Sequence, residues 1–206
     1  MKISGVVFDF GGVITKLTMP EFVRPIADEL GIEWGLLTDG FGKYRRIMDG
    51  DLMTMQEMYV RIFADAGLSF SAETIERIVE RDRASYCERN EETIAFMRSL
   101  KERGYKIGIL TNMCRSFIPL FKSHFADAIA LADALVISGE EHMYKPQKCI
   151  YELLRSRIGL EANELCFFDD AKMNCDGALL DGWNSIRFLD IAQAKAEFNT
   201  LLGIDP

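Results

Sequence analysis

The stretch GVVFDFGGV, at residues 5–13, decides how the rest of the chain is interpreted. Its first four residues include no polar side chain, which predicts a short strand buried on both faces, as in a parallel sheet. The strand stops at Asp9, and Gly11 and Gly12 then allow the backbone to turn sharply and approach a ligand closely. An acidic residue at this end of a strand lies where open α/β sheets bind ligands. Taken alone, the stretch is as consistent with a plain strand and glycine turn that Asp9 merely caps.

Two further predicted strands also end in polar residues. The runs KIGIL at residues 106–110 and LCFF at residues 165–168 are both apolar after their first residues, and a Lys-Pro pair that lies between them predicts the start of a helix. The chain therefore offers an acid, a hydroxyl and an amide, a lysine, and an acidic pair. In chain order these residues are Asp9, Thr111, Asn112, Lys145, Asp169 and Asp170.

This order and spacing resemble those of the haloacid dehalogenase-like superfamily of phosphatases and hydrolases, over the whole chain. The resemblance implies a Rossmann-like, doubly wound parallel α/β sheet with an inserted α-helical cap. It also implies that Asp9 attacks phosphorus to form an aspartyl-phosphate, which divides one difficult step into two easier ones. Because two anions must then meet, the site needs positive charge, and the resemblance implies Mg²⁺ as the cofactor. Its expected ligands are Asp9, the Gly11 carbonyl and Asp170, with Asp169 bound through water or placed behind them.

The resemblance also assigns roles to the remaining motif residues. Lys145 is expected to neutralise phosphoryl charge and to restrain the nucleophile. The Thr111 hydroxyl is expected to donate to a phosphoryl oxygen, and Asn112 to help position the substrate. The N–H groups of the turn at Gly11 and Gly12 offer an anion-binding nest.

One position departs from the phosphatase pattern. Phosphatases of the superfamily usually carry a second Asp two residues after the nucleophile, as a general acid and base, and here that residue is Gly11. Such catalysis is typically worth about 10²–10⁴-fold. A phosphatase in which another group supplies the proton is one interpretation, since the Asp-x-Gly pattern is similar to that of bacterial glucose-1-phosphatase-like members. A metal-independent 2-haloacid dehalogenase is the second, although such enzymes do not keep the acidic pair, and an impaired binding or regulatory protein is the third.

The chain order predicts a core interrupted by one helical insert. Residues 16–89 show helical signals only, including a capping box at Thr54 and Glu57, whereas strands and helices alternate from residue 90, with further strands at residues 134–138 and 184–188. We therefore expect a core of residues 1–15 and 90–206 and a cap of residues 16–89 that confers specificity. Basic residues in the cap are more consistent with a solvated face than with a substrate contact; they are Lys43, Arg45 and Arg46.

Composition excludes several classes of partner. The net charge of −8 and the lack of a basic cluster argue against nucleic acid and anionic membranes. No apolar run approaches the roughly 20 residues of a membrane helix, and the first strand begins too early for a signal peptide. The five cysteines include no Cys-x-x-Cys pair, which indicates reduced thiols in a cytoplasmic protein. We expect a small phosphorylated metabolite, with a phosphosugar as the best guess, and either a monomer or a homodimer.

Overall fold

A computed structural model describes residues 2–16 and 19–204. Within these residues, the strands form a five-stranded sheet in the order β3-β2-β1-β4-β5, and all neighbouring pairs are parallel. The strands are β1 (Gly5–Phe8), β2 (Lys106–Thr111), β3 (Ala134–Ile137), β4 (Leu165–Asp169) and β5 (Asn184–Arg187). This arrangement confirms the predicted Rossmann-like doubly wound α/β fold, with the strand that precedes Asp9 at its centre.

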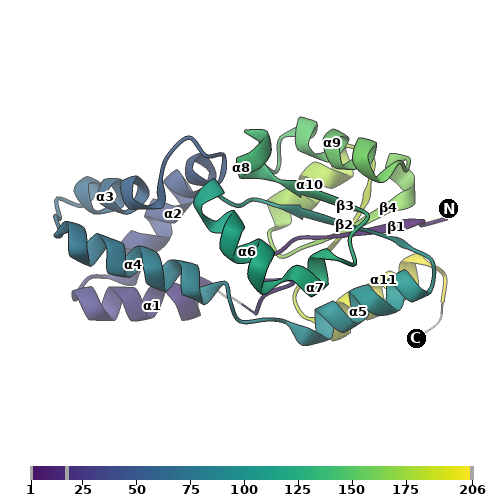
Figure 1. Cartoon of the computed structure of the whole chain (residues 1–206), viewed down its shortest axis with the longest axis horizontal. Coiled ribbons are helices and arrows are strands. Elements are labelled where there is room, and N and C mark those ends of the chain that lie inside the picture. Colours follow the sequence, from purple (N-terminus) through teal and green to yellow (C-terminus); the bar gives the residue numbers. More distant parts are fainter. Residues whose placement is uncertain (1, 17–18, 205–206) are drawn as a thin grey trace.

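Helices cover both faces of the sheet, which is why its strands are apolar on both sides. Side chains of β1 alternate between two hydrophobic clusters, with Val6 and Phe8 in one and Val7 in the other. Figure 1 shows α5 and α11 on one face of the sheet, and α9 and α10 on the other. The helices of the core are α5 (Glu91–Glu102), α6 (Ile118–His124), α7 (Ala126–Ile129), α8 (Ser138–Glu141), α9 (Lys148–Ile158), α10 (Lys172–Leu180) and α11 (Ile191–Leu201).

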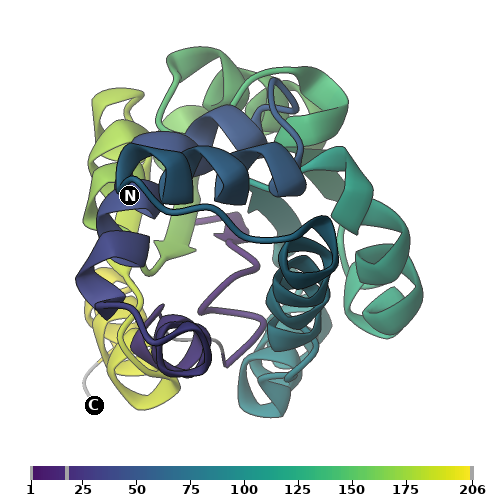
Figure 2. The same ribbon diagram turned by 90° about the vertical axis from the view of Figure 1, so that its left-hand side faces the viewer.

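The insert between β1 and α5 is helical and lies beyond the end of the sheet (Figures 1 and 2). Its helices, called the cap helices below, are α1 (Met19–Leu30), α2 (Trp34–Asp49), α3 (Met55–Asp65) and α4 (Ala72–Ser85). The capping box of Thr54 and Glu57 begins α3 as predicted. Glycines at positions 35, 40 and 42 lower the helix propensity of α2, so the sequence gives no boundaries for it. One of them has a packing role, because a Cβ atom on Gly40 would lie 2.5 Å from Cγ1 of Ile62 on α3.

Two antiparallel segments connect the cap helices to the core. Thr15 and Arg89 form an isolated bridge, and the N–H of Asn90 donates to the carbonyl of Ile14 at 2.8 Å. The division of the chain into independent units at residues 15/16 and 89/90 stays a prediction. Among the described residues, no helix combines the length and the apolar character needed to cross a membrane.

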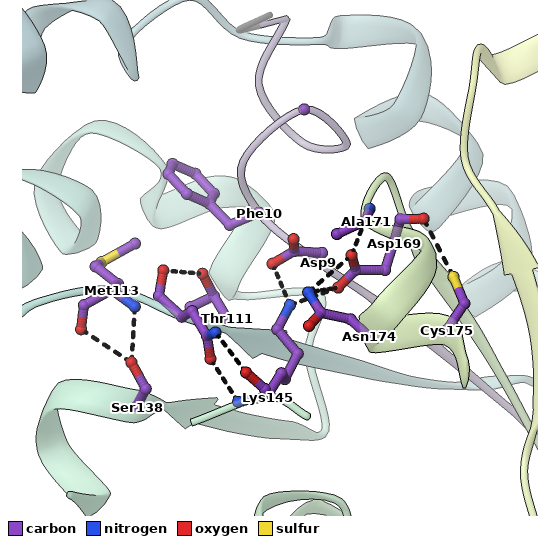
Figure 3. A network of polar contacts seen from close by, with 12 residues as sticks. Asp9, Phe10, Thr111, Met113, Ser138, Lys145, Asp169, Ala171, Asn174 and Cys175 are labelled. Carbon is purple, nitrogen blue, oxygen red and sulfur yellow. Dashed lines mark hydrogen bonds and ion pairs between the residues drawn. The ribbon is translucent and has the colours of Figure 1, made fainter. Parts of the chain in front are cut away.

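The prediction that Pro146 begins a helix is wrong. The following helix, α9, begins at Lys148, with Gln147 as its N-cap. Pro146 instead lies inside a tight turn, because the N–H of Gln147 donates to the Tyr144 carbonyl at 2.8 Å and the Gln147 side chain accepts from the Tyr144 N–H at 3.0 Å. The turn directs the Lys145 side chain toward the end of the sheet (Figure 3).

Candidate active site

Strands β1 and β4 bring the predicted acidic residues to one edge of the sheet. Phe8 pairs with Phe168 of β4, so Asp9, which follows β1, and Asp169, the last residue of β4, lie on neighbouring strands at the same level. One ligand oxygen from each of Asp9, Asp169 and Asp170 lies within 4.8 Å of the others. Figure 3 shows the carboxyl groups of Asp9 and Asp169 directed at the ammonium group of Lys145.

Lys145 is buried between the two carboxylates. Its Nζ lies 2.7 Å from Oδ1 of Asp9 and 2.6 Å from Oδ2 of Asp169. Burial alone lowers the pKa of Lys145, but the charges of Asp169 and Asp9 outweigh burial and raise that pKa. Lys145 therefore stays charged. Burial and the nearby Asp169 raise the pKa of Asp9 well above its ordinary value, and Lys145 opposes that shift.

Asn112 holds the backbone of Lys145 in place. Its Nδ2 donates to the Lys145 carbonyl at 3.1 Å, and its Oδ1 accepts from the Lys145 N–H at 2.8 Å. Thr111 is buried, and its hydroxyl lies 3.5 Å from the Asn112 carbonyl. The roles predicted for Thr111 and Asn112 toward a phosphoryl group stay predictions, whereas the hydrogen bonds of Asn112 position Lys145.

The two acids of the last motif lie in different surroundings. Asp169 is buried and accepts hydrogen bonds from the Ala171 N–H at 2.9 Å and from Asn174 Nδ2 at 3.0 Å, besides that of Lys145. Asp170 is exposed, and partial desolvation together with the charge of Asp169 raises its pKa. Asp169 is therefore a fixed partner of Lys145, whereas the Asp170 carboxylate is available to a ligand.

The glycine turn lies directly against Asp170. Gly12 has a φ of +73°, and a Cβ atom there would lie 3.1 Å from Cγ of Asp170. A side chain at position 12 would therefore be strained and would collide with this carboxylate. Gly11 does not share the positive φ, so its backbone conformation does not itself require glycine.

A cavity of about 260 Å³ lies between this edge and the cap helices. The core contributes the glycine turn, Asp9, Lys145, Asp170 and Asn174 to its wall, whereas the cap helices and the segment that follows them contribute Arg45, Asp49, Arg83 and Tyr86. This volume is just below the roughly 300–1,000 Å³ of typical ligand pockets, so the cavity suits a small molecule.

The interpretation of the cap cations as a solvated face is wrong for Arg45. Its guanidinium group donates to the Tyr86 hydroxyl and lies 3.3 Å from Asp49 and 3.7 Å from Asp82. Lys43, by contrast, is exposed and pairs with Asp65. The sequence patterns also miss Asp49 and Tyr86, because neither residue follows a predicted strand, and their approach to the site depends on how α2 and the end of α4 pack against the core.

Fold and site place this chain among the Rossmann-like α/β hydrolases with a helical layer over the active edge. A model of the haloacid dehalogenase-like hydrolase family matches residues 3–179, and the chain belongs to that family.

One relative with a known activity is a haloacid dehalogenase. The (S)-2-haloacid dehalogenase 4A of Burkholderia cepacia is 26% identical over 119 residues, which make up 53% of this chain and 51% of that protein. The chain thus spans about half the length of this relative.

Two solved structures from different organisms are similar to this chain. A HAD family enzyme of Bacteroides thetaiotaomicron has a TM-score of 0.69 at 19% identity, over 95% of this chain and 99% of that one. It is also known in complex with magnesium and inorganic phosphate. The L-2-haloacid dehalogenase of Xanthobacter autotrophicus, with chloropropionic acid covalently bound, has a TM-score of 0.66 at 16% identity, over 99% and 85%. At these identities the likeness shows the fold.

Proposed function

We propose that the protein is a Mg²⁺-dependent phosphatase that acts on a small phosphorylated metabolite, with a phosphosugar as the favoured class. The observation that carries this proposal is a surplus of negative charge at the edge of the sheet. Among the described residues there, the carboxyl groups of Asp9, Asp169 and Asp170 cluster around the ammonium group of Lys145. An anionic substrate would be repelled from this cluster unless a further cation joined it.

The donors present fit Mg²⁺. Oδ1 of Asp9 is held by Lys145, whereas no hydrogen bond from the described part of the chain reaches its second oxygen, and Asp170 presents an exposed carboxylate beside the glycine turn. With the Gly11 carbonyl, these groups form a small all-oxygen set of the kind that Mg²⁺ uses together with water and phosphate oxygens. Asp169 would orient the site rather than bind directly, because both of its oxygens already accept hydrogen bonds. When bound, the ion would offset the charge of the phosphoryl group and draw it against Asp9.

The side chains of the site then have separate tasks. An oxygen of Asp9 forms a bond to phosphorus as the bond to the leaving oxygen breaks, and water later releases phosphate from the aspartyl-phosphate. Lys145 directs Asp9 and offsets charge that develops on the phosphoryl oxygens. Asn112 keeps Lys145 in register through the two backbone hydrogen bonds described above. The cap helices close the cavity on its far side and would select the alcohol portion of the substrate.

A 2-haloacid dehalogenase is the second candidate, because the Burkholderia and Xanthobacter relatives are haloacid dehalogenases. A halide leaves without a proton and its displacement from carbon needs no divalent cation, so this activity would persist after metal is removed. The surplus acidic residue Asp170 has no task in such a reaction, which is why the phosphatase is favoured.

One experiment separates the two candidates. Phosphate release from a panel of phosphorylated sugars and small metabolites, and halide release from 2-chloropropionate, should each be measured with Mg²⁺ and with EDTA. We expect phosphate release that EDTA abolishes and Mg²⁺ restores. Halide release that EDTA leaves unchanged, with no phosphate released from any substrate, would establish the dehalogenase instead.

Variants then test the site itself. Asp9→Asn should abolish turnover without unfolding the protein, and Asp170→Asn should lose activation by Mg²⁺. Asp176→Asn is the matched control, because Asp176 lies on the neighbouring helix and is paired with Lys172 at the surface. Equal Mg²⁺ activation of the Asp170→Asn and Asp176→Asn proteins would contradict the assigned cation site.

A further inference from the structure

The proposed reaction lacks a proton donor at the edge of the sheet. When the phosphate ester of an ordinary alcohol is cleaved, the alcohol oxygen leaves as an alkoxide, which needs a proton as its bond to phosphorus breaks. Asp9 and Asp170 are assigned to attack and to the cation, and Lys145 stays charged between two carboxylates. Position 11, next to the nucleophile, offers no side chain.

The space that a side chain at position 11 would enter is bordered on the cap side by Tyr86. A Cβ atom on Gly11 would meet Cε1 of Tyr86 at 3.4 Å. The Tyr86 hydroxyl accepts a hydrogen bond from Arg45, and Nε of Arg45 lies 3.3 Å from Oδ1 of Asp49. A connected set of side chains therefore runs from above the glycine turn to the carboxyl group of Asp49.

Asp49 is a carboxyl group of the cavity wall that the proposed mechanism does not otherwise use. The carboxyl-bearing residues of this wall, among those the structure describes, are Asp9, Asp49 and Asp170. Asp49 is 5% exposed, as the last residue of α2. The two arginines of the wall, Arg45 and Arg83, keep their protons at any working pH and cannot act as acids.

The end of α2 is attached to the same core segments that hold Lys145. The Ser138 hydroxyl donates to the Asp49 carbonyl at 2.5 Å and accepts from the Met113 N–H, next to Asn112, at 2.8 Å. Asp51 pairs with Arg115 at 3.3 Å. These contacts hold the end of α2, and with it Asp49, in a defined position relative to the core edge of the cavity.

We propose that Asp49 is the general acid and base of the reaction, an inference that rests on the proposed phosphatase function. In the first step, an Asp9 oxygen bonds to phosphorus, the bond from phosphorus to the leaving oxygen breaks, and the proton of Asp49 passes to that oxygen. In the second step, the Asp49 carboxylate takes a proton from water as the water oxygen bonds to phosphorus. The bond from Asp9 to phosphorus then breaks, which releases phosphate and restores both carboxyl groups.

The surroundings of Asp49 suit this alternation. Burial raises its pKa from the ordinary value, and Arg45 and then Lys145 oppose that shift, so the protonated form that the first step needs is favoured over that of an exposed aspartate. Burial raises the pKa of Tyr86 as well, which makes its phenol a poorer proton donor. The charged and titratable groups that surround Asp49 are Arg45, Asp82, Tyr86, Cys114 and Lys145.

Pre-steady-state kinetics with two leaving groups test the proposal. Nitrophenolate leaves unprotonated, whereas the alkoxide of glycerol 3-phosphate does not. We expect Asp49→Asn to keep a burst of nitrophenolate from p-nitrophenyl phosphate, followed by slow turnover. Its first step with glycerol 3-phosphate should be slower than that of the wild type by about 10²–10⁴-fold. Asp51→Asn, which perturbs the same contact between cap and core, should keep both first steps.

The alternatives give different results. Equal slowing of both first steps in Asp49→Asn would show a structural role and overturn the proposal, as would loss of the alkyl step in Tyr86→Phe instead. A measurement on the wild type alone does not depend on whether a variant folds. A wild type that cleaves aryl but not alkyl phosphates has no proton donor, and this result would also overturn the proposal. A wild type that releases phosphate from neither ester, nor from any phosphorylated sugar or metabolite of the panel, in the presence of Mg²⁺ contradicts the proposed function rather than the role of Asp49.

Discussion

Replacing Lys145 by methionine should be among the most destabilising single changes in the core. The ammonium group is buried and lies 2.7 Å from one Asp9 oxygen and 2.6 Å from one Asp169 oxygen. Methionine fills much of the same space but leaves two carboxyl groups facing each other without a counter-charge. Asp169 keeps its hydrogen bonds from Asn174 and Ala171, so part of its solvation survives.

The expected loss follows from the cost of an uncompensated buried charge. Removing one partner of a buried ion pair typically costs about 3–5 kcal/mol. With a urea m-value of about 3 kcal/mol per M, this loss lowers the unfolding midpoint by roughly 1–1.7 M. Adding Asp9→Asn to Lys145→Met should recover part of the loss, because it removes one of the two facing charges.

Urea unfolding followed by circular dichroism measures these values, with EDTA present so that no metal ion replaces the ammonium group. Lys148→Met is the matched control, because Lys148 lies three residues further on, is exposed and pairs with Glu152 at the surface. A Lys145→Met protein as stable as Lys148→Met would refute the reasoning, and so would a double variant less stable than the single one.

Two further predictions concern the fold. Gly40→Ala should lower the free energy of unfolding by about 1–3 kcal/mol, because its Cβ would lie 2.5 Å from Ile62. Gly42→Ala, on the same helix, meets open space and should raise that free energy by up to about 1 kcal/mol. Equal urea midpoints for the two variants would contradict the close contact at Gly40. Asp133 has a lowered pKa because hydrogen bonds from Lys101 and from a backbone N–H outweigh burial, so its contribution to stability is present above the unfolded-state pKa of about 4 and is lost as pH falls further. Asp133→Asn should therefore lower the urea midpoint more at pH 7 than at pH 3, and a constant difference would refute the linkage.

The core could be predicted from sequence because its signals are local. Each strand that precedes a functional residue is a short apolar run, and the polar residue that ends it takes its position from the strand itself. The central place of β1 and the meeting of Asp9 with Asp169 follow once such strands lie parallel. The start of α9 is an exception, because the sequence predicts that Pro146 begins that helix. The hydrogen bonds of Gln147 with Tyr144 instead place Pro146 in a turn, which the preference of proline for the first turn of helices does not reveal.

The cap side of the cavity could not be predicted in the same way. Helix α2 contains three glycines, and its stability depends on packing that Gly40 permits against Ile62. Arg45 and Asp49 are four residues apart, so their proximity is a local helix effect, but nothing in their spacing indicates that this face meets the core. That information lies in the contact of Ser138 with the Asp49 carbonyl, between residues 89 positions apart.

Under the proposed function, core and cap divide the chemistry of the reaction between them. The core edge contains the groups that act on phosphorus, and its surplus of carboxylates sets the need for a cation. The leaving group faces the opposite wall, where Asp49, Arg45 and Tyr86 are connected. Since the backbone of Asp49 is bound to Ser138, whose hydroxyl also bonds the segment beside Asn112, the proton donor and Lys145 share one support. Changes in α2 should therefore alter which phosphate esters the protein cleaves, whereas the dependence of activity on Mg²⁺ should change only with the core residues.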